Sequence, residues 1–183
     1  MKNILVVMNM QNGLVDTPEK VQLSQKIIEL TQKHIFDRIV CVKFVNRDDG
    51  VFPKYHRYYD MHKGKEIELV DELTADLVIN RSVYSCVSEE FISKVMKIND
   101  NDNLVELFLC GIGTDTSILK SALDLFEMDI KPLVLSEYCM AYDNSAITHM
   151  KGIKIIEKMI SEKCIVNKKI NSAEDLQGIA CIK

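Results

Sequence analysis

The chain alternates short, continuous apolar runs with longer segments in which apolar residues recur at helical spacing. Short apolar runs bounded by polar residues are typical of strands that are buried on both faces of a parallel sheet. We predict six such strands, at Ile4–Met8, Ile39–Val45, Leu77–Asn80, Leu104–Cys110, Lys131–Ser136 and Cys164–Val166.

Amphipathic segments lie between these runs and predict four helices, at Val21–Ile35, Ser88–Met96, Thr116–Phe126 and Ser145–Ile160. A final helix is predicted to begin near Ser172, with Asp175 in the position of a capping-box acid. Alternating strands and helices with right-handed crossovers favour a doubly wound, mainly parallel six-stranded sheet. Helices on both faces would make it a three-layer α/β/α sandwich. We find no linker or repeat, so residues 1–183 are expected to form a single domain.

Charge and hydropathy exclude several classes of protein. The chain has 23 Lys and Arg against 27 Asp and Glu, a formal net charge of −4 at pH 7. A mildly acidic chain is a poor binder of polyanions, so we expect no nucleic-acid partner. No apolar run approaches the roughly 18 residues of a membrane span, and the N-terminus has no signal-peptide pattern. We therefore expect a cytoplasmic protein without membrane contacts.

Six cysteines are present, and no two of them form a C-x-x-C pair. This spacing excludes zinc ribbons and thioredoxin-like redox motifs. Without a secretory signal, disulfides are not expected. We predict buried, reduced thiols, including Cys139, because a reactive cysteine needs an exposed and electropositive setting.

The stretch Asn46–Lys65 is the least regular part of the chain. Two interpretations stay open for it: a lid or oligomer contact, or a solvated surface loop. It contains His56 and His62, which are six residues apart and have no acid at helical spacing to complete a ligand set. We predict neither a metal nor another cofactor.

Polar segments follow three of the predicted strands. They are Asn9–Gly13 after the first strand, Arg81–Ser85 after the third and Gly111–Ser117 after the fourth. In a doubly wound sheet, ligands bind at the carboxyl ends of the strands, near the switch in strand order. Backbone amides in the first turn of a following helix also favour an anionic ligand. These segments are therefore the candidate functional site.

The same segments resemble the isochorismatase-like cysteine hydrolases, a family that includes nicotinamidases and other small amidases. The family pattern Asp-Met-Gln-Asn is matched by Asn9–Asn12, and the pattern Cys-Gly-Val-x-Thr-Asp-x-Cys-Val is matched by Cys110–Ile118. A family strand that ends in Lys, followed by a Tyr-Ser pair, is matched by Val78–Arg81 and Tyr84-Ser85. The resemblance runs nearly end to end, and it implies the same α/β/α fold and assembly as a homodimer or homotetramer.

The resemblance implies a catalytic triad in which an Asp activates a Cys thiolate and a Lys supports charge in the site. A thioester intermediate then forms, and water hydrolyses it. In this chain the three positions hold Asn9, Arg81 and Ser117. Around them, the matched segments predict contacts with a small-molecule ligand from Gln11, Tyr84, Gly113, Thr114 and Ile118.

The three substitutions remove the implied chemistry. The Asn9 amide cannot take a proton, and losing a general base costs typically about 10²–10⁴-fold in rate. A serine such as Ser117 is a weak nucleophile unless a base is adjacent. Arg81 stays cationic but cannot donate a proton at ordinary pH. Some family members cleave a vinyl ether by using the same Asp as an acid, and Asn9 removes that route as well.

Three functional hypotheses follow. The first is a catalytically degenerate member that binds a small carboxylate or amide, with Arg81 as a bidentate fork and amides near Ser117 and Ile118 holding an anionic oxygen. The second is an active amide hydrolase with Ser117 as nucleophile, and the third is a structural or regulatory oligomer without a ligand. In a purely structural alternative, Asn9, Arg81 and Ser117 only form hydrogen bonds with one another as a buried polar cluster.

Overall fold

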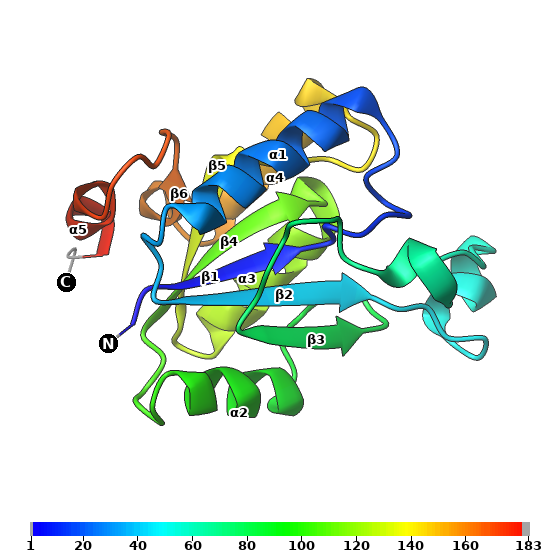
Figure 1. Cartoon of the computed structure of the whole chain (residues 1–183), viewed down its shortest axis with the longest axis horizontal. Coiled ribbons are helices and arrows are strands. Elements are labelled where there is room, and N and C mark those ends of the chain that lie inside the picture. The colour runs from blue at the N-terminus through cyan, green and yellow to red at the C-terminus, as the bar shows by residue number, and fades with distance from the viewer. Residues whose placement is uncertain (1, 181–183) are drawn as a thin grey trace.

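The computed structural model describes residues 2–180 and contains one six-stranded sheet. Its strands lie in the order β3-β2-β1-β4-β5-β6, and every neighbouring pair is parallel (Figure 1). The predicted doubly wound sheet is therefore confirmed, and the strand order switches between β1 and β4. The strands are β1 (Ile4–Met8), β2 (Arg38–Phe44), β3 (Leu77–Arg81), β4 (Glu106–Ile112), β5 (Lys131–Met140) and β6 (Ile165–Val166).

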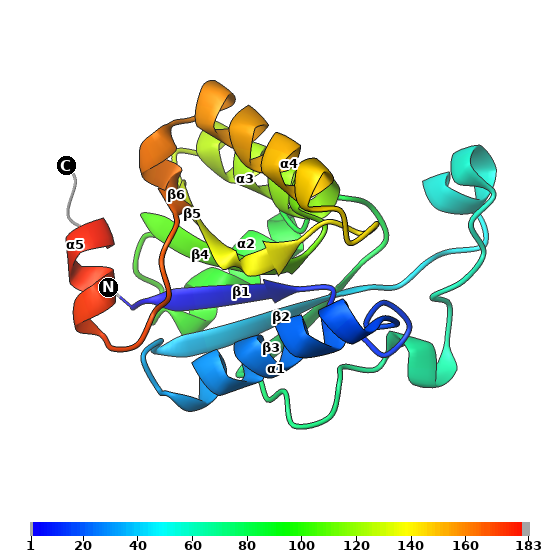
Figure 2. The same cartoon turned by 90° about the horizontal axis from the view of Figure 1, so that it is seen from above.

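Helices cover both faces of this sheet. Helix α1 lies on one face and helices α2, α3 and α4 lie on the other, which gives three layers (Figures 1 and 2). The α-helices are α1 (Pro18–Gln32), α2 (Glu89–Ile98), α3 (Leu119–Glu127), α4 (Ala146–Met159) and α5 (Glu174–Ala180). Four short helical turns complete the elements: η1 (Phe52–His56), η2 (Gly64–Ile67), η3 (Thr114–Ile118) and η4 (Glu162–Cys164).

Helix α1 begins and ends three residues earlier than the predicted span Val21–Ile35. The reason is a cap that the apolar periodicity does not reveal. The Thr17 hydroxyl accepts a hydrogen bond from the Lys20 amide, and Pro18 takes the first helical position, where its missing N–H costs nothing.

Two other helices begin one residue after the start of their predicted ranges, because the first predicted residue is the cap. Ser88 and Ser145 precede α2 and α4, and each side chain accepts a hydrogen bond from an amide of the first turn. In the first turn of α5, the Asp175 carboxylate accepts hydrogen bonds from the amides of Asn171 and Ser172. This contact is the reciprocal half of a capping box, as predicted for this segment.

Two strands differ from the expectation drawn from their apolar runs. Strand β3 is an edge strand, so its side chains alternate between buried and exposed instead of being buried on both faces. Strand β5 does not end at Ser136 but continues to Met140, after a shift in its register against β4 between Leu109 and Gly111. The extension carries the chain farther along the carboxyl edge of the sheet.

Residues 46–67, here called the arm, extend past the carboxyl ends of β2 and β3 (Figure 2). The stretch predicted to be irregular thus contains η1 and the start of η2. The Asn46 side chain fastens the base of the arm by donating hydrogen bonds to the carbonyls of Tyr58 and Asp60, at 2.9 and 3.1 Å. A loop with its own turns and internal bonds is organised rather than merely solvated.

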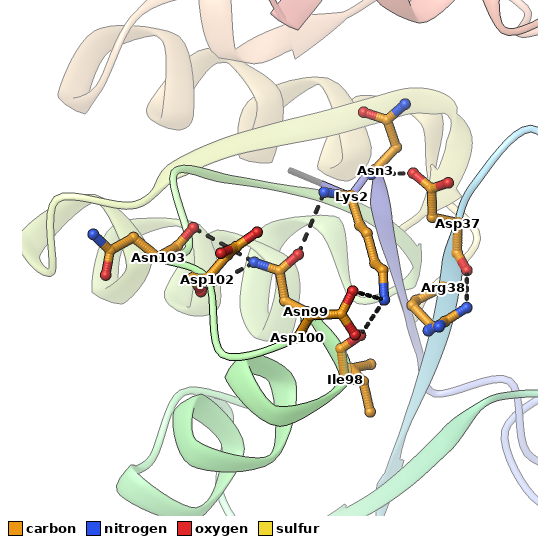
Figure 3. Close-up of polar contacts among 9 residues, drawn as sticks. All are labelled: Lys2, Asn3, Asp37, Arg38, Ile98, Asn99, Asp100, Asp102 and Asn103. Carbon is orange, nitrogen blue, oxygen red and sulfur yellow. Dashed lines mark hydrogen bonds and ion pairs between the residues drawn. The ribbon is translucent and has the colours of Figure 1, made fainter.

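A polar cluster closes the opposite, amino-terminal edge of the sheet (Figure 3). The buried Asn99 accepts a hydrogen bond from the Lys2 amide at 3.3 Å and donates one to the Asp102 carbonyl at 3.1 Å. The Lys2 ammonium group also pairs with Asp100 at 2.7 Å. These contacts hold the amino-terminal edge of the sheet to the end of α2.

The thiols of Cys41, Cys86, Cys110, Cys139 and Cys164 are free and buried, as predicted. Cys181 lies outside the described residues. Burial raises the pKa of Cys139 to about 12, and its thiol donates to the Leu135 carbonyl at 3.1 Å. Within residues 2–180, no helix has the length and apolarity needed to cross a membrane.

Candidate functional site

The carboxyl ends of β1, β3 and β4 bring the three triad-equivalent residues into direct contact. One terminal nitrogen of Arg81, Nη2, donates hydrogen bonds to Asn9 Oδ1 at 2.5 Å and to Ser117 Oγ at 3.0 Å. Arg81 is the last residue of β3, Asn9 follows β1, and Ser117 lies in η3 immediately after β4. Segments that are far apart in the sequence thus form one buried cluster.

Unusual backbone conformations allow this convergence. Asn9 has a φ of 64°, a left-handed conformation that asparagine tolerates better than most residues. Opposite it, Gly111 has a φ of 122°, and a Cβ atom there would lie 2.0 Å from the Met8 carbonyl oxygen. Only glycine lets β1 and β4 approach so closely at the point where the site begins.

The orientation of the Asn9 amide is set by its neighbours. Its Nδ2 donates to the Ile112 carbonyl at 2.7 Å and to the Tyr142 hydroxyl at 2.8 Å. Since a carbonyl can only accept and a guanidinium can only donate, the amide nitrogen faces Ile112 and the amide oxygen faces Arg81. A carboxylate in place of Asn9 would set an oxygen against the Ile112 carbonyl oxygen.

Arg81 is a buried cation without a counter-ion. Its side chain is 8% exposed, and Nη1 donates to the Val83 carbonyl, while Nε is buried without a hydrogen-bond partner. Among the described residues, no carboxylate lies within ion-pair distance of it. Burial lowers the pKa of Arg81, opposed by the neighbouring Tyr142, but a guanidinium stays protonated at neutral pH.

Ser117 is fully buried and has no general base among its partners. Its Oγ lies 3.0 Å from Arg81 Nη2 and 3.3 Å from the Tyr142 hydroxyl. Neither group is suited to remove a proton from a serine at neutral pH, because one is a cation and the other an alcohol. In this arrangement the Ser117 hydroxyl is a hydrogen-bonding group.

Tyr142 is the residue of this cluster that the sequence analysis missed. It lies two residues beyond the end of β5, at the same edge of the sheet as Asn9 and Ser117. The rule that strand ends carry the site applies to β5 as well. The predicted end of that strand at Ser136 places Tyr142 outside the strand-end segments, and Cys139, which lies between these two residues, is buried and hydrogen-bonded inside the sheet.

A pocket of about 350 Å³ opens above the cluster, a volume suited to a small organic molecule. Its wall is mainly aromatic, and Arg81 is the one permanently charged side chain in it. The arm supplies three of the lining residues, which favours the lid interpretation of that segment. The lining residues are Leu14, Phe44, Phe52, His56, Tyr58, Arg81, Tyr84, Thr116, Ser117 and Tyr142.

Of the five residues predicted to contact a ligand, Tyr84 lines the pocket and the other four do not. The fully buried Gln11 side chain accepts from the Phe44 amide at 2.6 Å and donates to the Phe44 and Ile67 carbonyls at 2.9 and 3.1 Å. Its amide is therefore fully used within the protein, joining β2 to the arm.

The predicted anion-holding amide of Ile118 is also used internally, because it donates to the Gly113 carbonyl at 2.8 Å. Gly113 itself takes a φ of 100° at the start of η3. The buried Thr114 hydroxyl lies 2.9 Å from Nδ1 of His149, a residue of α4 that the sequence does not link to this segment. These three residues shape the turn that carries Ser117.

The described residues do not offer a metal site. No three His, Cys, Asp or Glu side chains within residues 2–180 gather closely enough to hold an ion. The His62 ring and the Asp48 carboxylate lie 3.3 Å apart, but they form a pair only. This pair in the arm has too few ligands to hold a metal ion.

Comparison with known proteins places this geometry in context. A family model described as the isochorismatase domain matches residues 3–164. A comparison with curated protein sequences gave no match. The solved structure of an isochorismatase-like hydrolase from Alkaliphilus metalliredigens is similar, with a TM-score of 0.75 at 12% identity, over 97% of this chain and 98% of that one.

Two further solved structures are similar over most of their length. Yeast nicotinamidase bound to the inhibitor nicotinaldehyde has a TM-score of 0.74 at 15% identity, over 91% of this chain and 100% of that one. N-carbamoylsarcosine amidase from Thermoplasma acidophilum has a TM-score of 0.69 at 20% identity, over 87% and 92%. At these identities the structures share the fold, while function depends on the residues of each site.

Proposed function

The chain belongs to the isochorismatase domain family, and from that premise we propose that it is a catalytically degenerate member that binds a small carboxylate or amide in its pocket. The fold is that of a hydrolase, but the residues at the three triad-equivalent positions are Asn9, Arg81 and Ser117. An amide, a guanidinium and an alcohol supply neither a general base nor an activated nucleophile.

The observation that carries the proposal is the buried, uncompensated charge of Arg81. Removing a cation from water without pairing it costs several kcal/mol by order of magnitude, so such groups are retained mainly where they have a use. Here the guanidinium contributes to the wall of a pocket of about 350 Å³. A ligand oxygen in that pocket would supply the missing acceptor.

A buried polar cluster of this kind could be purely structural, with no ligand in the pocket. Hydrogen bonds join Arg81 to Asn9 and Ser117, as the purely structural alternative expects, but Arg81 Nε has no hydrogen-bond partner. Because Arg81 also lines the pocket and has no counter-ion among the described residues, the arrangement favours ligand binding over a purely structural cluster.

Isothermal titration calorimetry with a panel of small carboxylates and amides, cyclic and open-chain, tests the proposal. We expect at least one of them to bind, and Arg81→Met to weaken its binding at least about tenfold, since hydrogen bonds to charged groups contribute about 1.5–3 kcal/mol. Arg38→Met is the matched control, because it removes the same charge at the amino-terminal start of β2. It should bind like the parent protein.

Two results would overturn the proposal. If no panel member binds at millimolar concentration, the pocket is not a binding site for these classes. If ammonia is released from an amide by the parent protein but not by Ser117→Ala, the protein is a serine-dependent hydrolase instead. Thermal unfolding of each variant separates loss of binding from loss of the fold.

A further inference from the structure

The hydrogen-bonding inventory of the pocket discriminates between the two ligand classes of the proposed function, on which this inference rests. Asn9 is fully buried and is not among the residues that line the pocket. Its oxygen accepts from Arg81, and its two amide hydrogens go to the Ile112 carbonyl and the Tyr142 hydroxyl. The amide oxygen of Asn9 therefore serves Arg81 inside the protein, and the buried amide presents no group to the pocket.

Arg81 still has donors to spare. Of its five N–H groups, three are used, one toward the Val83 carbonyl, one toward Asn9 and one toward Ser117. The second hydrogen of Nη1 remains, and so does the Nε–H, although the Nε atom itself is buried. A guanidinium has no acceptor at all, so whatever satisfies these groups must bring its own lone pairs.

Two hydroxyl groups add to the donors. The Tyr142 oxygen accepts from Asn9, and the Ser117 oxygen accepts from Arg81. Their mutual contact at 3.3 Å uses one hydroxyl proton, whichever group donates it. The other proton is then free to point into the pocket. The side chains of this cluster therefore present donors to a ligand.

The other residues of the pocket wall do not change this excess of hydrogen-bond donors over acceptors. None of its lining residues is an Asp or a Glu, and its other polar side chains are hydroxyl groups and the His56 ring, which both donate and accept. Burial, with the nearby Asp60 carboxylate, raises the pKa of Tyr58 to about 12, so that hydroxyl keeps its proton at neutral pH.

We propose that this pocket selects carboxylates and discriminates against the corresponding amides. An ionised carboxylate is an acceptor only, and it matches the unpaired charge and the remaining Nη1–H of Arg81 together with a hydroxyl proton from Ser117 or Tyr142. An amide of the same shape replaces one acceptor with an NH₂ group that faces donors. The pocket thus recognises a small organic acid with an apolar body, seated against the aromatic side chains of the wall.

Asn9 sets this preference without facing the ligand directly. An aspartate at the same position would pair with Arg81 through a short internal contact and neutralise the charge that a ligand carboxylate needs. It would also bring a negative charge next to the Tyr142 hydroxyl. Asn9→Asp is therefore expected to abolish the preference for acids.

Calorimetric titration at pH 7 with matched pairs tests the inference: benzoate against benzamide, and cyclohexanecarboxylate against its amide. We expect the acid of at least one pair to bind at least about tenfold more tightly than its amide, which is a difference of about 1.4 kcal/mol. Asn9→Asp should lose at least about tenfold in acid affinity. The control Asn103→Asp, at an exposed position outside the pocket, adds the same charge and should leave the difference unchanged.

The outcomes separate this inference from the proposed function. Equal binding of acid and amide, or tighter binding of the amide, would overturn the inference while leaving a functional ligand site. An acid preference that persists in folded Asn9→Asp would also overturn it. Should Asn9→Asp fail to fold, Arg81→Lys provides the second test, because it keeps the charge but not the paired donors. Arg81→Lys should reduce the difference in binding affinity between the acid and its amide.

Discussion

At the scale of single residues, Gln11 stabilises the junction between the sheet and the arm. Its side chain satisfies the amide and the carbonyl of Phe44 and the carbonyl of Ile67, all in a buried setting. Replacing it with a shorter apolar residue would leave these three backbone groups without partners. Each such group costs about 1–3 kcal/mol when it is buried and unsatisfied.

We therefore expect Gln11→Ala to lower the free energy of unfolding by at least about 3 kcal/mol. Urea denaturation followed by circular dichroism measures the change. Gln25→Ala, at an exposed position of α1, is the control and should change stability by no more than about 0.5 kcal/mol. A small effect of Gln11→Ala, equal to that of the control, would show that Gln11 does not stabilise the junction between the sheet and the arm.

For single residues, the sequence predicts which residues lie at the site better than it predicts which groups their side chains contact. The strand-end rule and the family resemblance bring out Asn9, Arg81 and Ser117, and the structure joins them by hydrogen bonds. Gln11 has the same motif support, yet its side chain turns to backbone groups of β2 and the arm. Spacing along the chain does not reveal which way a side chain points when both directions offer polar partners.

At the scale of elements, η3 decides where Ser117 lies. The sequence predicts one helix over Thr116–Phe126, but the structure has the π-helical turn η3 before α3. The left-handed Gly113 starts this turn, and Gly152 of α4 packs against it. A local pattern of apolar residues does not distinguish these two windings, because contacts from α4 select between them.

Gly152→Ala should displace this turn. A Cβ atom at position 152 would lie 2.8 Å from both the Asp115 Cα atom and the Thr114 carbonyl oxygen. Although alanine favours helices by about 1 kcal/mol over glycine, we expect a net loss of about 1–3 kcal/mol from overpacking.

Binding of the preferred panel ligand should weaken in the same variant, because Ser117 moves with the turn. Thermal unfolding and calorimetric titration check the two effects. Lys151→Ala, an exposed neighbour on the same helix, should preserve both stability and binding. An unchanged affinity in Gly152→Ala would show that η3 does not depend on this contact.

At the scale of the whole molecule, stability should depend on pH through His149. Burial lowers the pKa of His149, opposed by the charges of Glu137 and Asp115. The unfolded chain, with a histidine pKa of about 6.5, then binds more protons than the folded one. Stability is therefore full above about pH 6.5 and falls as the pH drops below it.

Urea unfolding between pH 7.5 and 5 measures this slope. We expect His149→Gln to reduce it, while the exposed His34→Gln keeps it. The carboxyl groups with lowered pKa values, such as Asp143 and Asp175, respond only below about pH 4, so they do not obscure this window. An identical slope in the parent protein and His149→Gln would contradict the assignment.

The architecture of the whole molecule was the most predictable level. Continuous apolar runs such as Ile4–Met8 indicate buried parallel strands, and the sheet follows from them. The irregular composition of the arm did not show that it would wall a pocket, because its position depends on long-range bonds from Gln11 and Asn46. The homodimer or homotetramer implied by the family resemblance stays a prediction, which light scattering in solution checks.

The arm has a consequence for proteolysis. It carries the exposed Lys54 and Arg57 on either side of His56, while Phe52, His56 and Tyr58 face the pocket. Trypsin cleaves a bond only when the chain around it opens locally, and a ligand that touches these side chains opposes that opening. The rate at which the arm is cut would then report occupancy of the pocket, without labels and without knowledge of any reaction.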